Sequence, residues 1–98
     1  MMNARVNNII NAIASEFHRN FDVNATLLLF GSRANNTAIQ YSDIDLAIDS
    51  KAELHEGKLL KFKDFIDDFP TLYGIDLVDM NAANVQLKKQ IELNNRVL

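Results

Sequence analysis

The chain alternates between stretches in which apolar residues recur every three or four positions and shorter stretches in which they are continuous or alternate. Residues 4–19 carry one apolar stripe at helical spacing and predict an amphipathic helix. A second helix is predicted over 51–68 and a third over roughly 82–93. Ser50 and Glu53 stand three residues apart, a capping-box pattern that predicts the start of the second helix.

The ends of these helices are marked by residues that oppose helix continuation. Pro70 stops the second helix. Asn81 is the expected cap of the third helix, and Asn94 with Asn95 tolerates the left-handed conformation that often ends a helix.

Three strands are predicted between the helices. Residues 26–30 are expected to form a buried strand because they contain the continuous apolar run Leu27–Phe30, and residues 43–49 alternate between an apolar and a polar face. Residues 74–79 predict the third strand. A short helix or structured loop is expected over 33–38, and a short terminal strand at 97–98.

The element order α-β-(α)-β-α-β-α predicts the α/β (α+β) class, with helices packed on a sheet. The short span between the first two strands favours antiparallel neighbours, because a parallel crossover usually needs a dozen or more residues. With 98 residues, the chain is expected to form one domain over 1–98.

Composition narrows the classes of function. The chain has no cysteine, which excludes disulfides and thiolate metal sites. Its net charge of −3 and the lack of a basic run argue against strong nucleic-acid binding. No apolar run reaches the ~20 residues that a membrane span needs, and no signal peptide is visible, so a cytoplasmic protein is the default expectation.

A glycine-serine turn follows the first predicted strand and can hold phosphate. Gly31 lets the backbone approach a ligand closely, and the following N–H groups can point at an anion. Ser32 adds a hydroxyl donor, and Arg33 adds a charge suited to phosphate oxygens. Taken alone, the pair is more typical of an ordinary strand-ending turn, and neither a P-loop nor a dinucleotide fingerprint is present.

Two acids on the second strand, Asp43 and Asp45, point to the same face, about 6.5–7 Å apart along the chain. Mg²⁺ prefers such oxygen ligands together with substrate phosphates, although a solvated strand face is the simpler account of two acids alone. Asp76 could join them if the third strand lies beside the second, and three carboxylates could then hold two Mg²⁺ ions about 3.5–4 Å apart. Asp79 is the rival third acid, but its odd offset from Asp76 favours another face or a cap of the last helix.

The combination of these motifs resembles a known family. The strings Leu29–Ala34 and Ser42–Ile48 contain Gly-Ser, ten intervening residues and Asp-x-Asp, and Ile75–Asp79 looks like the third-acid strand. This pattern is similar to the minimal nucleotidyltransferases (MNT) of the DNA polymerase β-like superfamily. The resemblance implies a nucleotidyltransferase fold, with a small mixed sheet of three to four strands and helices packed mainly on one side.

The resemblance also implies Mg²⁺-dependent transfer of a nucleoside monophosphate, usually AMP from ATP, to an acceptor hydroxyl. By position, Gly31 and Ser32 would hold the β- and γ-phosphates, with Arg33 as a further phosphate contact. Asp43 and Asp45 would bind both metals, and Asp76 would bind the catalytic metal and take the acceptor proton.

One departure from the family lies in the glycine-serine turn. Asn35 and Asn36 replace a basic residue and a glycine, and asparagine can still take the left-handed angles that the turn needs.

Many members of the family act with a helical HEPN-domain protein encoded nearby, as toxin–antitoxin pairs. The resemblance therefore implies an antitoxin that adds AMP to such a partner, in a possible homo- or hetero-oligomer. Two alternatives stay open: an antitoxin of the same fold that inhibits by binding alone, and a transferase that modifies a small molecule.

Overall fold

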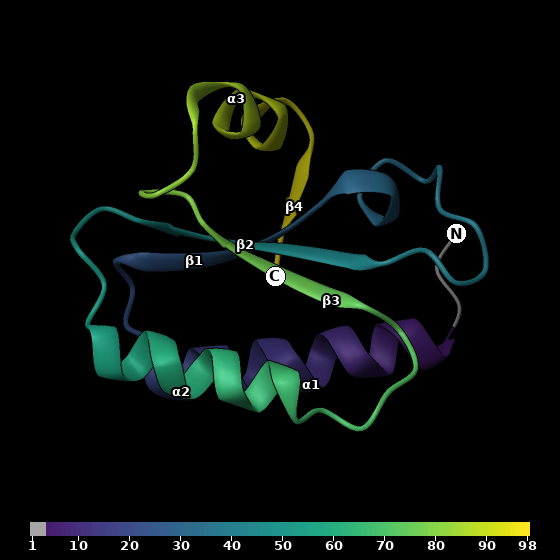
Figure 1. Cartoon of the computed structure of the whole chain (residues 1–98), viewed down its shortest axis with the longest axis horizontal. Coiled ribbons are helices and arrows are strands. Elements are labelled where there is room, and N and C mark those ends of the chain that lie inside the picture. The colour runs from purple at the N-terminus through teal and green to yellow at the C-terminus, as the bar shows by residue number, and fades with distance from the viewer. Residues whose placement is uncertain (1–3) are drawn as a thin grey trace.

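The computed structural model describes residues 4–98, in which three α-helices pack on a four-stranded sheet (Figure 1). The elements are α1 (Ala4–Asn20), β1 (Ala25–Phe30), the 3₁₀ turn η1 (Gly31–Arg33), β2 (Ile44–Ser50), α2 (Glu56–Asp67), β3 (Ile75–Asp79), α3 (Val85–Leu93) and β4 (Asn95–Val97). This order confirms the α+β class expected from the sequence. No helix in the described part of the chain is both long and apolar enough to cross a membrane.

The sheet is mixed, with strand order β3-β2-β1-β4. β1 pairs with β2 in antiparallel fashion, as the short span between them predicts. β2 and β3 are parallel, and α2 provides the crossover between them. β4 pairs antiparallel with the outer edge of β1.

Two of the three helices cover one face of the sheet. Figure 1 shows α1 and α2 on one side, whereas α3 and η1 lie on the other. The face toward α1 and α2 carries the alternate residues Ile44, Leu46 and Ile48 of β2, which are fully buried. On the opposite face, Ala47 of β2 and Ile91 of α3 belong to a second, smaller apolar cluster.

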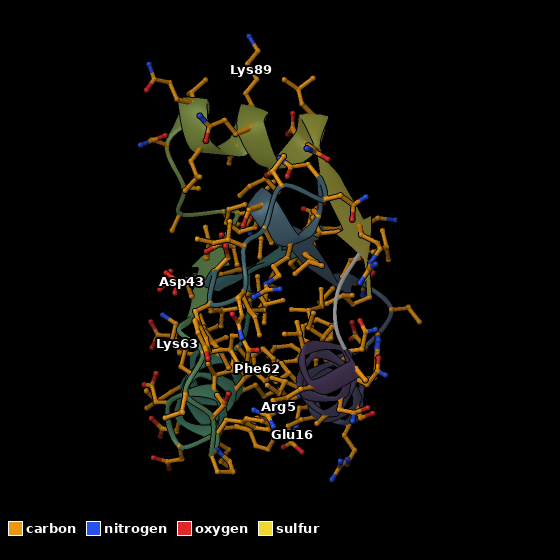
Figure 2. The ribbon with its side chains drawn as sticks, turned by 90° about the vertical axis from the view of Figure 1, so that its right-hand side faces the viewer. Arg5, Glu16, Asp43, Phe62, Lys63 and Lys89 are labelled. Carbon is orange, nitrogen blue, oxygen red and sulfur yellow. The ribbon has the colours of Figure 1, made fainter. Side chains whose placement is uncertain are left out.

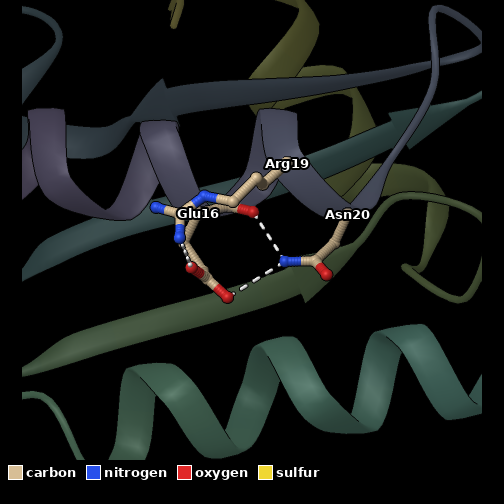
Figure 3. A network of polar contacts seen from close by, with 3 residues as sticks. All are labelled: Glu16, Arg19 and Asn20. Atoms are coloured by element: carbon tan, nitrogen blue, oxygen red, sulfur yellow. Dashed lines mark hydrogen bonds and ion pairs between the residues drawn. The ribbon is translucent and has the colours of Figure 1, made fainter.

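Helix α1 buries the apolar stripe that the sequence predicts. The buried residues are Val6, Ile9, Ile10, Ile13 and Phe17. At the end of the helix, Asn20 Nδ2 donates to the Glu16 carbonyl at 2.8 Å and to Glu16 Oε2 at 3.0 Å (Figure 3). The Asn20 amide therefore satisfies one of the last-turn carbonyls that a helix leaves without an internal partner.

Helix α2 begins later than the sequence prediction of residue 51, so the predicted capping box is wrong. Ser50 is still the last residue of β2, and its hydroxyl donates to the Ala52 carbonyl at 2.5 Å. The N-cap is His55 instead, whose Nδ1 accepts from the Lys58 N–H at 3.3 Å. The pairing of Ser50 with Ala25 of β1 is a tertiary contact that competes with the local capping signal.

The predicted ends of the last helix also shift. Asn84, not Asn81, caps α3 and accepts from the Leu87 N–H at 2.8 Å. Asn94 is extended, with φ −152° and ψ 94°, because the chain leaves the helix directly into β4. The described non-glycine residue with positive φ is Asn36 (φ 62°), in the turn where asparagine was expected to replace glycine.

Candidate active site

Strand pairing places the predicted acids on one face at one end of the sheet. Asp45 of β2 lies opposite Asp76 of β3 in the parallel register. Asp43 directly precedes β2, and Figure 2 shows it at the level of the sheet, between α3 above and α2 below. By strand alternation these side chains face away from the core under α1 and α2. The structure thus brings Asp45 and Asp76 together and leaves Asp43 beside them.

The surroundings of Asp45 destabilise the charged form of its carboxyl group. Burial raises its pKa, and the negative charges of Asp76 and Asp43 raise it further. A side-chain hydrogen bond between Asp45 and Asp76 acts in the same direction, because such a bond needs one of the two carboxyl groups to carry a proton. Either a proton or a cation would relieve this repulsion.

Two glycines leave room for the acids. Gly31 has φ +72°, and a Cβ there would clash with Asp45 Oδ2 and lie 3.3 Å from Asp45 Cγ. A Cβ on Gly74, which directly precedes β3, would lie 2.5 Å from Asp43 Oδ1 and 3.1 Å from its Cγ. Both carboxylates therefore lie directly against glycine backbone, and side chains on those glycines would displace them.

The donor set suits Mg²⁺ shared with a substrate, not a metal held by protein alone. Within residues 4–98, no three His, Cys, Asp or Glu side chains converge in an arrangement that could hold an ion unaided. Mg²⁺ usually binds through one or two carboxylates plus substrate phosphates. The paired oxygens of Asp45 and Asp76, with the Asp43 charge nearby, fit that partial coordination.

The glycine-serine turn forms the other side of the site. η1 lies on the same side of the sheet as α3, the side that the acids face (Figure 1). The Gly31 carbonyl accepts from the N–H groups of Ala34 and Asn35 at 3.1 and 3.2 Å, which keeps the turn tight. Among the described residues, none forms a hydrogen bond with the Ser32 hydroxyl, so this group is available to a ligand.

Arg33 lies in the interior, with 5% of its surface exposed. Its Nη2 donates to the Ser42 carbonyl at 2.9 Å and lies 3.3 and 3.4 Å from the carbonyls of Gln40 and Ile39. The guanidinium carbon is 5.4 Å from the centre of the Tyr73 ring. All of these contacts are made within the chain. A contact between Arg33 and phosphate stays a prediction.

Asp79, the rival third acid, has a different environment. It pairs with Ile48, and its Oδ1 accepts from the Asn81 N–H at 2.9 Å in the turn after β3. Strand alternation puts it on the face opposite to Asp76.

A cavity of about 550 Å³ lies between the start of α1 and the segments that precede β2 and β3. Its lining is Arg5, Ile9, Tyr41, Pro70, Thr71, Leu72 and Tyr73. None of the three carboxylates belongs to this lining, so the cavity does not by itself locate the nucleotide.

Sequence reasoning missed two residues of this region, Gly74 and Tyr73. Gly74 was placed inside the third strand, but its importance comes from lying opposite Asp43, which only the strand register reveals. Tyr73 precedes a strand as many loop aromatics do, and no sequence signal links it to Arg33.

Residues 11–98 match the family described as polymerase beta, nucleotidyltransferase. No curated protein matches the sequence.

Solved structures show the same fold. One is a toxin–antitoxin complex with AMP-PNP, at a TM-score of 0.66 and 24% identity over 89% of this chain and 69% of that chain. A second is the MNT antitoxin with a tri-AMPylated HEPN toxin of Shewanella oneidensis, at a TM-score of 0.60 and 24% identity over 89% and 66%. A third is the toxin–antitoxin MntA-HepT, at a TM-score of 0.54 and 23% identity over 89% and 66%.

The family match spans the glycine turn and all three carboxylates, and it agrees with the resemblance seen in the sequence. The chain therefore belongs to the polymerase beta nucleotidyltransferase family.

Proposed function

We propose that this protein is an antitoxin that transfers AMP from ATP to a hydroxyl group on a helical HEPN-type partner. The observation that carries the proposal is the contact between Asp45 and Asp76 directly beside the Gly31 backbone. A carboxylate pair that needs a cation, next to a turn that can take phosphate, suits a metal-bound nucleoside triphosphate.

Each residue has a distinct role in this proposal. Gly31 and Ser32 hold the β- and γ-phosphates through backbone N–H groups and the free Ser32 hydroxyl. Asp43 and Asp45 hold both metal ions. Asp76, which is exposed at the edge strand β3, holds the catalytic ion and takes the proton of the acceptor hydroxyl.

Two bound Mg²⁺ ions would activate the acceptor oxygen and neutralise the charge on the leaving pyrophosphate. The residues of this chain orient the reaction around them. Because Gly31 and Gly74 carry no side chain, the Asp45 and Asp43 carboxylates can lie directly against the backbone. Carboxylates placed in this way before the substrate binds favour the transition state over the ground state.

The partner is proposed from the structural neighbours. Complexes of toxins with antitoxins recur among the structures that share this fold, and one of those toxins carries AMP. The exposure of Asp43 and Asp76 also suits a large acceptor, which can approach these carboxylates from outside.

The test is transfer of label from α-labelled ATP, with and without Mg²⁺, to the HEPN protein encoded nearest to this chain. We expect labelling that needs Mg²⁺ and is lost in Asp43→Ala. Transfer that survives this substitution would exclude the role of Asp43.

The same experiment separates catalysis from inhibition by binding. A double variant, Asp43→Asn with Asp45→Asn, keeps the shape of both side chains and removes their charge. If this variant still neutralises the partner as well as the wild type does, the protein acts by binding alone.

A further inference from the structure

Arg33 is a buried charge without a carboxylate partner in the described residues. Among those residues, an ion pair joins Arg19 to Glu16 on the surface of α1, and it does not involve Arg33. Burying an uncompensated charge is costly, so the surroundings must supply dipoles. For Arg33 these are the carbonyls around residues 39–42 and the face of the Tyr73 ring.

These contacts join three segments that carry the candidate site. Arg33 belongs to the same turn as Gly31 and Ser32. The 2.9 Å bond to the Ser42 carbonyl fixes the peptide unit that leads into Asp43. Tyr73 is followed by Gly74, whose carbonyl accepts from the Ile44 N–H at 2.8 Å.

The loop of residues 39–42, which Arg33 contacts, has few hydrogen bonds of its own. The Ser42 N–H donates to the Ile39 carbonyl at 3.1 Å, and the Ile39 N–H donates to the Ser42 hydroxyl at 2.9 Å. Ile39 and Tyr41 are 77% and 70% exposed, so apolar packing contributes little to holding the loop, and the Tyr41 ring contacts the Tyr73 ring with centroids 6.2 Å apart. The carbonyls of Ile39, Gln40 and Ser42, which accept from Arg33, link this loop to η1 by hydrogen bonds.

We propose that Arg33 is a positioning residue: it holds residues 39–42 in place and thereby sets the position of Asp43, instead of binding phosphate. The part of this proposal that concerns activity rests on the proposed transferase function. The part that concerns the loop stands on the contacts alone.

Amide hydrogen exchange on the protein without nucleotide tests the loop directly. Arg33→Met removes every donor and keeps an unbranched apolar side chain, and Arg96→Met on the exposed strand β4 is the matched control. We expect exchange at Ile39 and Ser42 to accelerate at least tenfold in Arg33→Met, with α1 amides and the control unchanged. Unchanged exchange at these two amides would overturn the proposal.

Transfer kinetics then separate positioning from phosphate contact, at a temperature where circular dichroism shows both variants folded. Positioning predicts that kcat falls tenfold or more, while KM for ATP changes less than threefold. Arg33→Lys should recover part of kcat, because an ammonium can reach the Ser42 carbonyl but cannot lie flat on Tyr73. A tenfold rise of KM with unchanged kcat would instead identify Arg33 as a phosphate ligand and refute positioning.

Two further results keep the outcomes distinct. If Arg33→Met does not fold, Tyr73→Leu removes the ring beneath the guanidinium, and Tyr73→Phe keeps it. Because the Tyr73 ring also contacts the Tyr41 ring, with centroids 6.2 Å apart, Tyr41→Leu is the control. We then expect faster exchange at Ser42 in Tyr73→Leu than in Tyr73→Phe or Tyr41→Leu, and equal exchange in the two leucine variants would overturn the proposal. If the wild type transfers no AMP, the proposed function fails, while exchange still decides whether Arg33 holds the loop.

Discussion

A methyl group on Gly74 should reduce catalysis while leaving the fold intact. The Cβ of Gly74→Ala would lie 2.5 Å from Asp43 Oδ1, whereas ordinary van der Waals contact begins near 3.4 Å. The Asp43 carboxylate must therefore move by about 0.9 Å, the difference between these distances. Because Asp43 is exposed, its side chain can turn away at little cost.

Gly74→Ala should change the activation free energy of transfer much more than the free energy of unfolding. A misplacement of about 1 Å in a reacting group can cost on the order of 100-fold in rate, which is about 2.7 kcal/mol. The backbone of Gly74 does not have the positive φ that only glycine takes readily, so alanine fits there. Replacing glycine at such a position stabilises a protein by about 0.4–1 kcal/mol through the unfolded state.

The measurements are AMP transfer at saturating ATP and Mg²⁺, and thermal unfolding of the same samples. We expect Gly74→Ala to transfer on the order of 100-fold more slowly with an unfolding free energy within about 1 kcal/mol of the wild type. Gly57→Ala is the matched control, because its Cβ would meet only the movable His55 ring, at 3.1 Å. Full activity of Gly74→Ala would refute the argument that Asp43 needs the space that Gly74 leaves.

Three other outcomes follow from the site and the core. Since the pKa of Asp45 is raised, its protonated form favours folding at low pH, and this contribution is lost as the pH rises through the raised pKa. Asp45→Asn should therefore be more stable than the wild type at about pH 7, with a difference that shrinks in acid, and urea unfolding across pH checks both the sign and the trend. Mg²⁺ with a non-hydrolysable ATP analogue should raise the melting temperature of the wild type but not of the Asp43→Asn and Asp45→Asn double variant, and equal shifts would argue against metal binding there. Phe62→Ala removes a ring that is 1% exposed and packs against Phe17, so chemical denaturation should show a loss of about 3–5 kcal/mol, and a loss below about 1 kcal/mol would contradict the packing.

The sequence was sufficient for elements that bury a regular apolar pattern. The stripe of α1 and the alternation of β2 both appear in the structure because burial on one face dominates their local energetics. The boundaries were less predictable where a tertiary contact competes with a local signal. Ser50 illustrates this, since strand pairing with Ala25 outweighs its capping pattern.

For the candidate site, the residue types were predictable but their surroundings were not. Spacing identified Asp43 and Asp45, and the meeting of Asp45 with Asp76 depended on a register that sequence alone does not set. The burial of Arg33 could not be predicted from the sequence, for a different reason. Its partners are backbone carbonyls, which every residue possesses, so no particular side chain in the sequence signals them.

The parallel register of β2 with β3 makes the protein unequally tolerant of changes in length. If one residue added to the turn at 71–74 shifts β3 along β2, the faces of Ile75 and Asp76 exchange, which sends a carboxylate toward Phe62 and an aliphatic chain toward Asp43 and Asp45. The segment 51–55 precedes α2 at the other end of the crossover, and it can lengthen at small entropic cost without altering that frame. In an alignment of homologues, insertions and deletions should therefore gather before α2 and be rare immediately before β3.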